Sequence, residues 1–175
     1  MELENLFGLP AHPLLVHMPV VIIPLAGIIA IVFAFKPAWL DRFGWGLVAL
    51  TGLGALGGIL AAASGEGLED ASGEGGAALE DHAELGEIAR TLGIVFFLVV
   101  LGVVLARYFA RKNASTEGVW AKVGSKGAGV VMSILLVMSA AAATVTIAQA
   151  GHQGAKLVWD EKDRGGEGDG DEDGD

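Results

Sequence analysis

The stretch Pro13–Phe35, PLLVHMPVVIIPLAGIIAIVFAF, decides the fold class of this chain. It contains no charged side chain and a single histidine, His17. A helix needs about 20 mainly apolar residues to cross the hydrocarbon core of a bilayer. No Lys or Arg precedes the stretch, whereas a secretory signal begins with positive charge. We therefore predict a transmembrane helix here and not a cleaved signal peptide.

Three further apolar stretches, at about 44–64, 91–106 and 127–149, predict three more spans. The composition agrees, with 53% apolar residues, 18% charged residues and a mean hydropathy of +0.56. A soluble domain has about 25% charged residues, which this chain lacks. The third stretch is short, but the flanking Arg90 and Arg107 can extend their charged ends to the membrane surface. We predict an all-α, integral membrane bundle of four antiparallel helices.

The predicted organisation has three parts. An extracytoplasmic N-terminus covers residues 1–12, the bundle covers residues 13–160, and an acidic tail of Gly, Asp and Glu covers residues 161–175. This composition is typical of disorder, so we expect the tail to be disordered. Within the second span, Gly54 and Gly58 form a small-residue pair of the kind that lets helices approach closely.

The distribution of Lys and Arg predicts the orientation of the bundle. The first and third loops hold seven basic residues against two acids, Asp41 and Glu117. The second loop has eight acids and the single basic residue Arg90. Cytoplasmic loops carry the excess of Lys and Arg. We therefore expect both termini to be extracytoplasmic, in the cytoplasmic (inner) membrane of a cell.

Composition also excludes several classes of function. Cysteine is absent, which excludes disulfides, zinc–thiolate sites, iron–sulfur ligation and haem attachment through Cys. The net charge of −10 argues against nucleic acid as a partner, and the lipid bilayer is the expected one. No nucleophile-elbow motif is present, so an electron carrier or redox subunit is favoured over a stand-alone enzyme.

All four histidines fall on the predicted extracytoplasmic side. They are supplied by three separate helix ends, with His12 and His17 at the first span, His82 before the third and His152 after the fourth. His17 is the strongest candidate ligand, because a polar ring inside an apolar span is costly unless it has a partner. His12 lies about 140° from it around a helix. His82 is expected to project above the membrane if its helix runs straight.

Carboxylates and one arginine accompany these histidines. Glu66 follows the second span and Asp81 precedes His82, so either could ligate a metal or orient an imidazole. The same acids could equally serve to keep the loop hydrated. Arg90 could pair with Glu87 or Asp81, extend to the membrane surface, or hold an anionic group such as a haem propionate.

Four motifs in order resemble a bacterial membrane family, the domain of unknown function 2231. The first runs Leu9-Pro-Ala-His-Pro-Leu-Leu-Val-His-Met-Pro19 and resembles the N-terminal signature of the family. Ala63-Ser-Gly-Glu66 and His82-Ala-Glu-Leu-Gly86 resemble its two middle motifs, and Gly151-His-Gln-Gly-Ala-Lys-Leu-Val-Trp159 its closing motif. The resemblance implies a four-span membrane domain. Relatives joined to cytochrome c-like or Rieske-type domains imply an extracytoplasmic redox partner.

Three hypotheses of function remain open at this point. The first is an electron-transfer protein that binds b-type haem through His17 with His82 or His152, the other histidines and Arg90 assisting. The second is a zinc or copper site made from His12, His17, His82 and His152 with Glu66 or Asp81. The third is a structural or assembly subunit without a cofactor.

Overall fold

The computed structural model describes the backbone of residues 5–6, 9–72, 77–113 and 118–166. It describes the side chains of residues 15–65, 80–113, 118–156 and 159. Two short strands, β1 (Asn5–Leu6) and β2 (Leu9–Pro10), pair antiparallel before the helices begin. Helices α1 (Ala11–Phe35), α2 (Pro37–Ser72), α3 (Ala77–Lys112) and α5 (Lys126–Gly166) are long, and α4 (Val119–Val123) is short.

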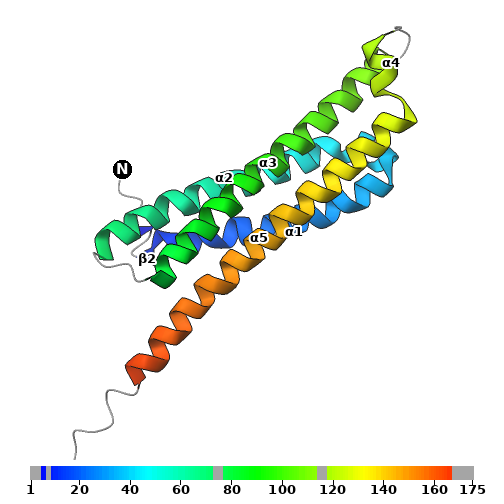
Figure 1. Ribbon diagram of the computed structural model, residues 1–175. Helices are drawn as coiled ribbons and strands as arrows, with labels where there is room; N and C mark the ends of the chain where they lie inside the picture. The colour runs from blue at the N-terminus through cyan, green and yellow to red at the C-terminus, as the bar shows by residue number, and fades with distance from the viewer. Residues whose placement is uncertain (1–4, 7–8, 73–76, 114–117, 167–175) are drawn as a thin grey trace, which may run out of the picture.

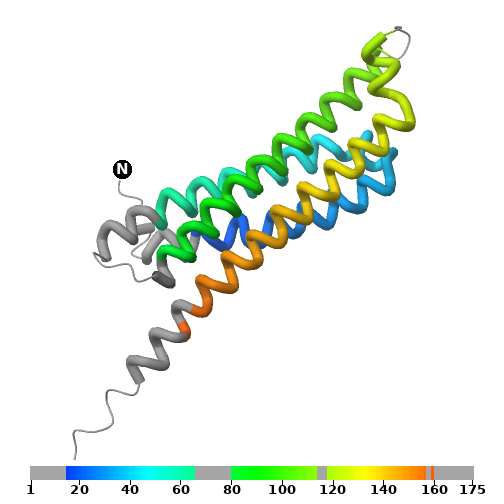
Figure 2. The backbone as a smooth tube through the Cα atoms, viewed as in Figure 1, coloured from blue at the N-terminus to red at the C-terminus, as the bar shows by residue number. Residues whose placement is uncertain are grey.

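The four long helices form an antiparallel bundle (Figures 1 and 2). Each packs against two neighbours, so that α1–α2, α2–α3, α3–α5 and α5–α1 are the adjacent pairs. All four are long and apolar enough to cross a membrane. Large apolar side chains such as Val21, Ile28 and Met138 are exposed on the outer surface, as expected of helices that face lipid. The predicted fold class, an all-α membrane bundle, is therefore confirmed.

The helices run further than the apolar stretches that predict them. α2 begins at Pro37 and not near residue 44, and α3 begins at Ala77, well before residue 91. α5 continues to Gly166, so residues 161–166 of the predicted tail are helical, while residues 167–175 lie outside the described part. The reason is physical: an apolar stretch marks the part of a helix within the hydrocarbon, and backbone hydrogen bonding does not stop at that boundary.

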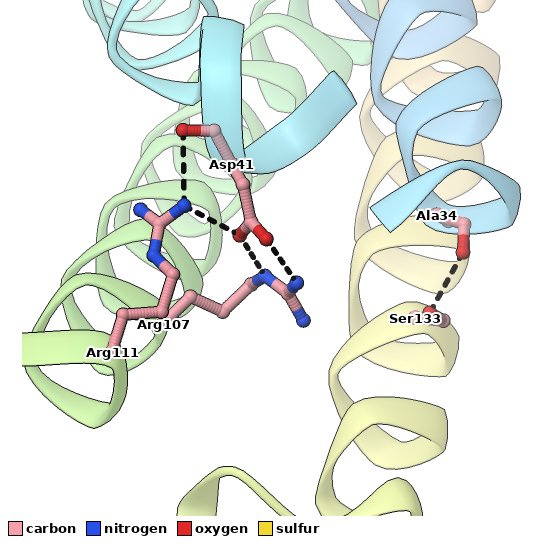
Figure 3. A network of polar contacts seen from close by, with 5 residues as sticks. All are labelled: Ala34, Asp41, Arg107, Arg111 and Ser133. Atoms are coloured by element: carbon pink, nitrogen blue, oxygen red, sulfur yellow. Dashed lines mark hydrogen bonds and ion pairs between the residues drawn. The ribbon is translucent and has the colours of Figure 1, made fainter. Parts of the chain in front are cut away.

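A proline between the first two helices gives the tightest connection. α1 ends at Phe35 and α2 starts at Pro37, because proline lacks the N–H needed to continue the helix. The carbonyl of Ala34, in the last turn of α1, accepts a hydrogen bond of 2.9 Å from Ser133 Oγ of α5 (Figure 3). This bond from α5 therefore satisfies a carbonyl in the last turn of α1.

Small residues line the contacts between helices. A Cβ at Gly54 would lie 2.9 Å from Ile23 of α1, whereas one at Gly58 would lie 3.8 Å from the Arg90 backbone of α3. The two glycines therefore serve different neighbours. Gly57 completes the contact with α1, since a Cβ there would lie 2.9 Å from Met18 Sδ and 3.1 Å from Pro19 Cδ. The absent side chain leaves space for the buried ring of Pro19.

A partly buried ion-pair network fixes the end of the bundle where α1 turns into α2 (Figure 3). Arg107 Nε and Nη2 of α3 donate to the two carboxylate oxygens of Asp41 on α2, at 2.7 and 2.9 Å. Arg111 Nη1 donates to the backbone carbonyl of Asp41 at 3.2 Å, and it also lies 3.2 Å from Oδ1 of the Asp41 carboxylate. We call these three residues the Asp41 cluster.

Candidate histidine site at one end of the bundle

Contacts with α5 show how the histidines are placed along the bundle. A Cβ at Gly151 would lie 3.8 Å from Val20 of α1, and one at Gly154 would lie 2.9 Å from His82 Cε1 of α3. Because α1 and α5 are antiparallel, His17, three residues before Val20, lies at about the height of Gly154. His152 lies two residues from Gly154, about 3 Å along the axis. His17, His82 and His152 therefore share one level of the bundle, at the end opposite the Asp41 cluster.

His82 is turned toward the interior of the bundle. It precedes Ala89 by seven residues and Phe96 by fourteen, and both of those side chains are 1% exposed. Seven residues are two helical turns, so His82 continues this buried stripe of α3. Its Nδ1 is buried, and its ring lies against Gly154, where a side chain would collide with it. His82 packs against α5 because α5 continues alongside α3 at the level of His82.

His17 lies on the outer surface of α1. It is exposed, as are Val21 and Ile28, which follow it at helical spacing on the same face. The apolar stretch places His17 near the start of the first span but does not indicate the direction of its side chain. His17 therefore does not face the bundle interior as the strongest ligand candidate would be expected to.

His152 is exposed and lies on a different side of α5 from the one that meets His82. It lies two positions before Gly154, which is about 200° around the helix. Gly151 faces α1, and His152 lies 100° further round, on the outer side of this contact. His17 flanks the same contact on α1. The structure thus brings His17 and His152 to the outer side of the α1–α5 contact and His82 to the interior.

The structure gives fewer contacts for the other predicted site residues. The side chains of His12, in the first turn of α1, and Glu66, in α2, lie outside the described part of the chain. Asp81 is exposed. Arg90 is half-buried, and its Nη2 donates to Glu87 Oε1 at 3.3 Å, one of the pairings expected. Among the described side chains, no three of His, Cys, Asp and Glu come together as a group that could hold a metal ion.

Two polar features of the structure are absent from the sequence predictions. Gln153 Oε1, beside Gly154, is buried without a hydrogen-bond partner among the described residues, and its sequence neighbourhood gives no sign of this. The Asp41 cluster had a usable signal, because Asp41 is one of two acids among seven basic residues in the first and third loops. A lone acid at a basic membrane surface is a natural partner for an arginine.

The fold defines an integral membrane protein in which α1, α3 and α5 bring histidines to one end of a four-helix bundle. The chain belongs to the DUF2231 family, described as predicted membrane protein, and the family model matches residues 8–163. Comparison with curated proteins and with solved structures gives no match.

Proposed function

We propose that this chain is a membrane electron-transfer protein that binds b-type haem at the level of His17, His82 and His152. The supporting observation is that these imidazoles come from α1, α3 and α5 to one height at one end of the bundle. Imidazole is the commonest protein ligand of haem iron. When bound, the haem would supply one-electron transfer.

The arrangement limits how a haem would be held. Among the described imidazoles, His82 faces the interior, while His17 and His152 lie outside, so no two face one another across a gap. The described residues thus do not fit a haem clamped between two of these imidazoles. The proposal therefore assigns the iron to His82, the imidazole that is turned toward the interior and packs against Gly154. Arg90, which donates to Glu87, lies eight residues after His82, about two helical turns along α3. Its positive charge would bind a haem propionate.

The haem proposal predicts that His82→Ala loses the cofactor while His152→Ala keeps most of it. The first change removes the inward imidazole, and the second removes an exposed one about 200° from the His82 contact. Reduced-minus-oxidised absorption spectra of the purified variants measure this directly. Wild-type levels of haem in His82→Ala would contradict the assignment. Loss of haem in His17→Ala as well would indicate two protein ligands.

A zinc or copper site is a second candidate, supported by the position of His17 and His152. Both are exposed on the outer side of the α1–α5 contact, at nearly one height. Two exposed imidazoles on one outer side of the bundle suit a single ion better than a planar macrocycle. Metal analysis after incubation with Zn²⁺ or Cu²⁺ should then show stoichiometric metal in wild type and in His82→Ala, and none when His17 and His152 are both alanine.

We further propose that the histidine end is extracytoplasmic, in the cytoplasmic membrane, with both termini outside. The support is the excess of Lys and Arg at the other end of the bundle. A cytochrome c-like or Rieske-type domain at this outer face is then the proposed electron partner.

The proposed orientation predicts that a cysteine at Asn113 reacts with a membrane-impermeant maleimide only after the cells are opened. Because the chain has no cysteine, a single introduced thiol gives an unambiguous signal. A cysteine at the exposed Glu84, at the histidine end, should react in intact cells. The reverse pattern of labelling would overturn the orientation.

A further inference from the structure

An apolar groove lies between α3 and α5, away from the histidine site. It has a volume of about 550 Å³, and its lining includes Gly102, Ala106, Ala128, Val131, Met132 and Leu135. Small residues create the groove, since a Cβ at Gly102 would meet no atom within 4 Å. Soluble proteins do not leave such a surface bare, and in a membrane it faces acyl chains or another helix.

The groove is about as long as two thirds of one leaflet's hydrocarbon depth. Along α3 it runs from Val99 to Ala106, and along α5 from Ala128 to Leu135. Seven residues of helix correspond to about 10 Å, against about 15 Å for half of the hydrocarbon core. Ala106 directly precedes Arg107, and Ala128 follows Lys126 by two residues. Lys126 lies about 200° around α5 from Ala128, so it marks the height of this end and does not line the groove. One end of the groove is therefore at the basic surface of the bundle.

Positive charge surrounds this end of the groove. The connection from α3 to α5, which contains α4, carries exposed Lys112, Lys122 and Lys126. Arg107 and Arg111 are engaged with Asp41 on the α2 side, whereas no described residue forms an ion pair with the three lysines. Trp120 of α4 packs on Phe109 of α3, with ring centroids 5.5 Å apart, and aromatic rings of this kind favour the membrane surface.

We propose that the groove binds one acyl chain of an anionic phospholipid, with its phosphate at the membrane surface at the height of Lys122 and Lys126. A second copy of the chain fits this surface less well. Two copies related by an axis along the membrane normal would bring their basic ends together, and like charges repel. The lipid site is independent of the histidine site and stands whether or not haem is bound.

Native mass spectrometry of the purified full chain tests the proposal with phosphatidylglycerol and phosphatidylcholine of identical acyl chains. Each lysine near a charged membrane surface contributes a factor of about 5 in affinity. We therefore expect one retained phosphatidylglycerol and a preference of tenfold or more. The double change Lys122→Ala and Lys126→Ala should remove most of that preference. Lys36→Ala with Arg42→Ala, at the α1–α2 end, is the matched charge control.

Gly102→Leu fills the groove without a collision and should abolish retention of both lipids. Gly46→Leu is its control, because a Cβ at Gly46 also meets no atom within 4 Å and α2 does not border the groove. Unchanged lipid retention in Gly102→Leu would overturn the proposal, as would equal effects of the two charge pairs. A wild-type dimer that Gly102→Leu converts to monomer would assign the groove to a second copy instead.

Discussion

Asp41→Ala is expected to destabilise the folded bundle by about 2–4 kcal/mol, because it leaves Arg107 without its partner at a partly buried position. The Asp41 and Arg107 side chains are 25% and 23% exposed. The two parallel hydrogen bonds at 2.7 and 2.9 Å are the strong, fork-shaped kind that arginine makes with a carboxylate. Thermal unfolding in detergent, followed by tryptophan fluorescence, measures the change.

Two further variants show whether the geometry of the pair matters. Arg107→Lys keeps the charge but loses the two parallel hydrogen bonds. It should therefore be less stable than wild type and more stable than Asp41→Ala. Asp81→Ala, at the other end and exposed, should shift the midpoint very little. Equal midpoints for Asp41→Ala and Asp81→Ala would show that the Asp41 cluster does not hold α2 and α3 together.

Gly27→Leu is expected to cost about 3 kcal/mol, because it forces α1 and α5 apart. A Cβ at Gly27 would lie 2.6 Å from Thr144 Oγ1 and 3.6 Å from the Ala140 carbonyl oxygen. The Cβ alone would collide with the Thr144 side chain and would already touch the α5 backbone at the Ala140 carbonyl, so the further atoms of leucine have no free space between the two helices. Detergent unfolding midpoints compared with Gly46→Leu isolate this effect.

The Gly46→Leu control corrects for the gain in helix propensity that comes from replacing any helical glycine. Both changes replace a helical glycine by leucine, and this replacement by itself stabilises the helix by up to about 1 kcal/mol. Gly46 faces open space, so its variant should be as stable as wild type or more so. A Gly27→Leu protein as stable as Gly46→Leu would mean that the α1–α5 contact is loose.

Hydropathy predicts the four helices well, because the bilayer permits few alternatives to a hydrogen-bonded helix. It does not predict where a helix ends, as the early start of α3 at Ala77 shows. Direction around the axis is also hidden. α1 is apolar on every side, so no polar face indicates which way His17 points. Its exposure, and the inward position of His82, depend on which helices pack together.

The sequence indicates that Asp41 should pair with an arginine, but for a related reason it does not indicate that the partner is Arg107. The two residues are 66 positions apart, and their pairing depends on the relative height of α2 and α3. Likewise, Gly54 and Gly58 are a single motif in the sequence, yet they meet two different helices. The sequence thus predicts which end of the bundle carries the histidines. The packing of the helices decides which of these histidines face inward.

The ring of contacts in this bundle has a consequence for its biogenesis. α1–α2 and α2–α3 join helices that are neighbours in the sequence, but α5–α1 joins the first span to the last. During synthesis the earlier spans emerge first. The face of α1 around Gly27 therefore remains against lipid until Thr144 has been inserted. The last span completes the assembly, and His17 and His152 reach the same level of the bundle only at that final step.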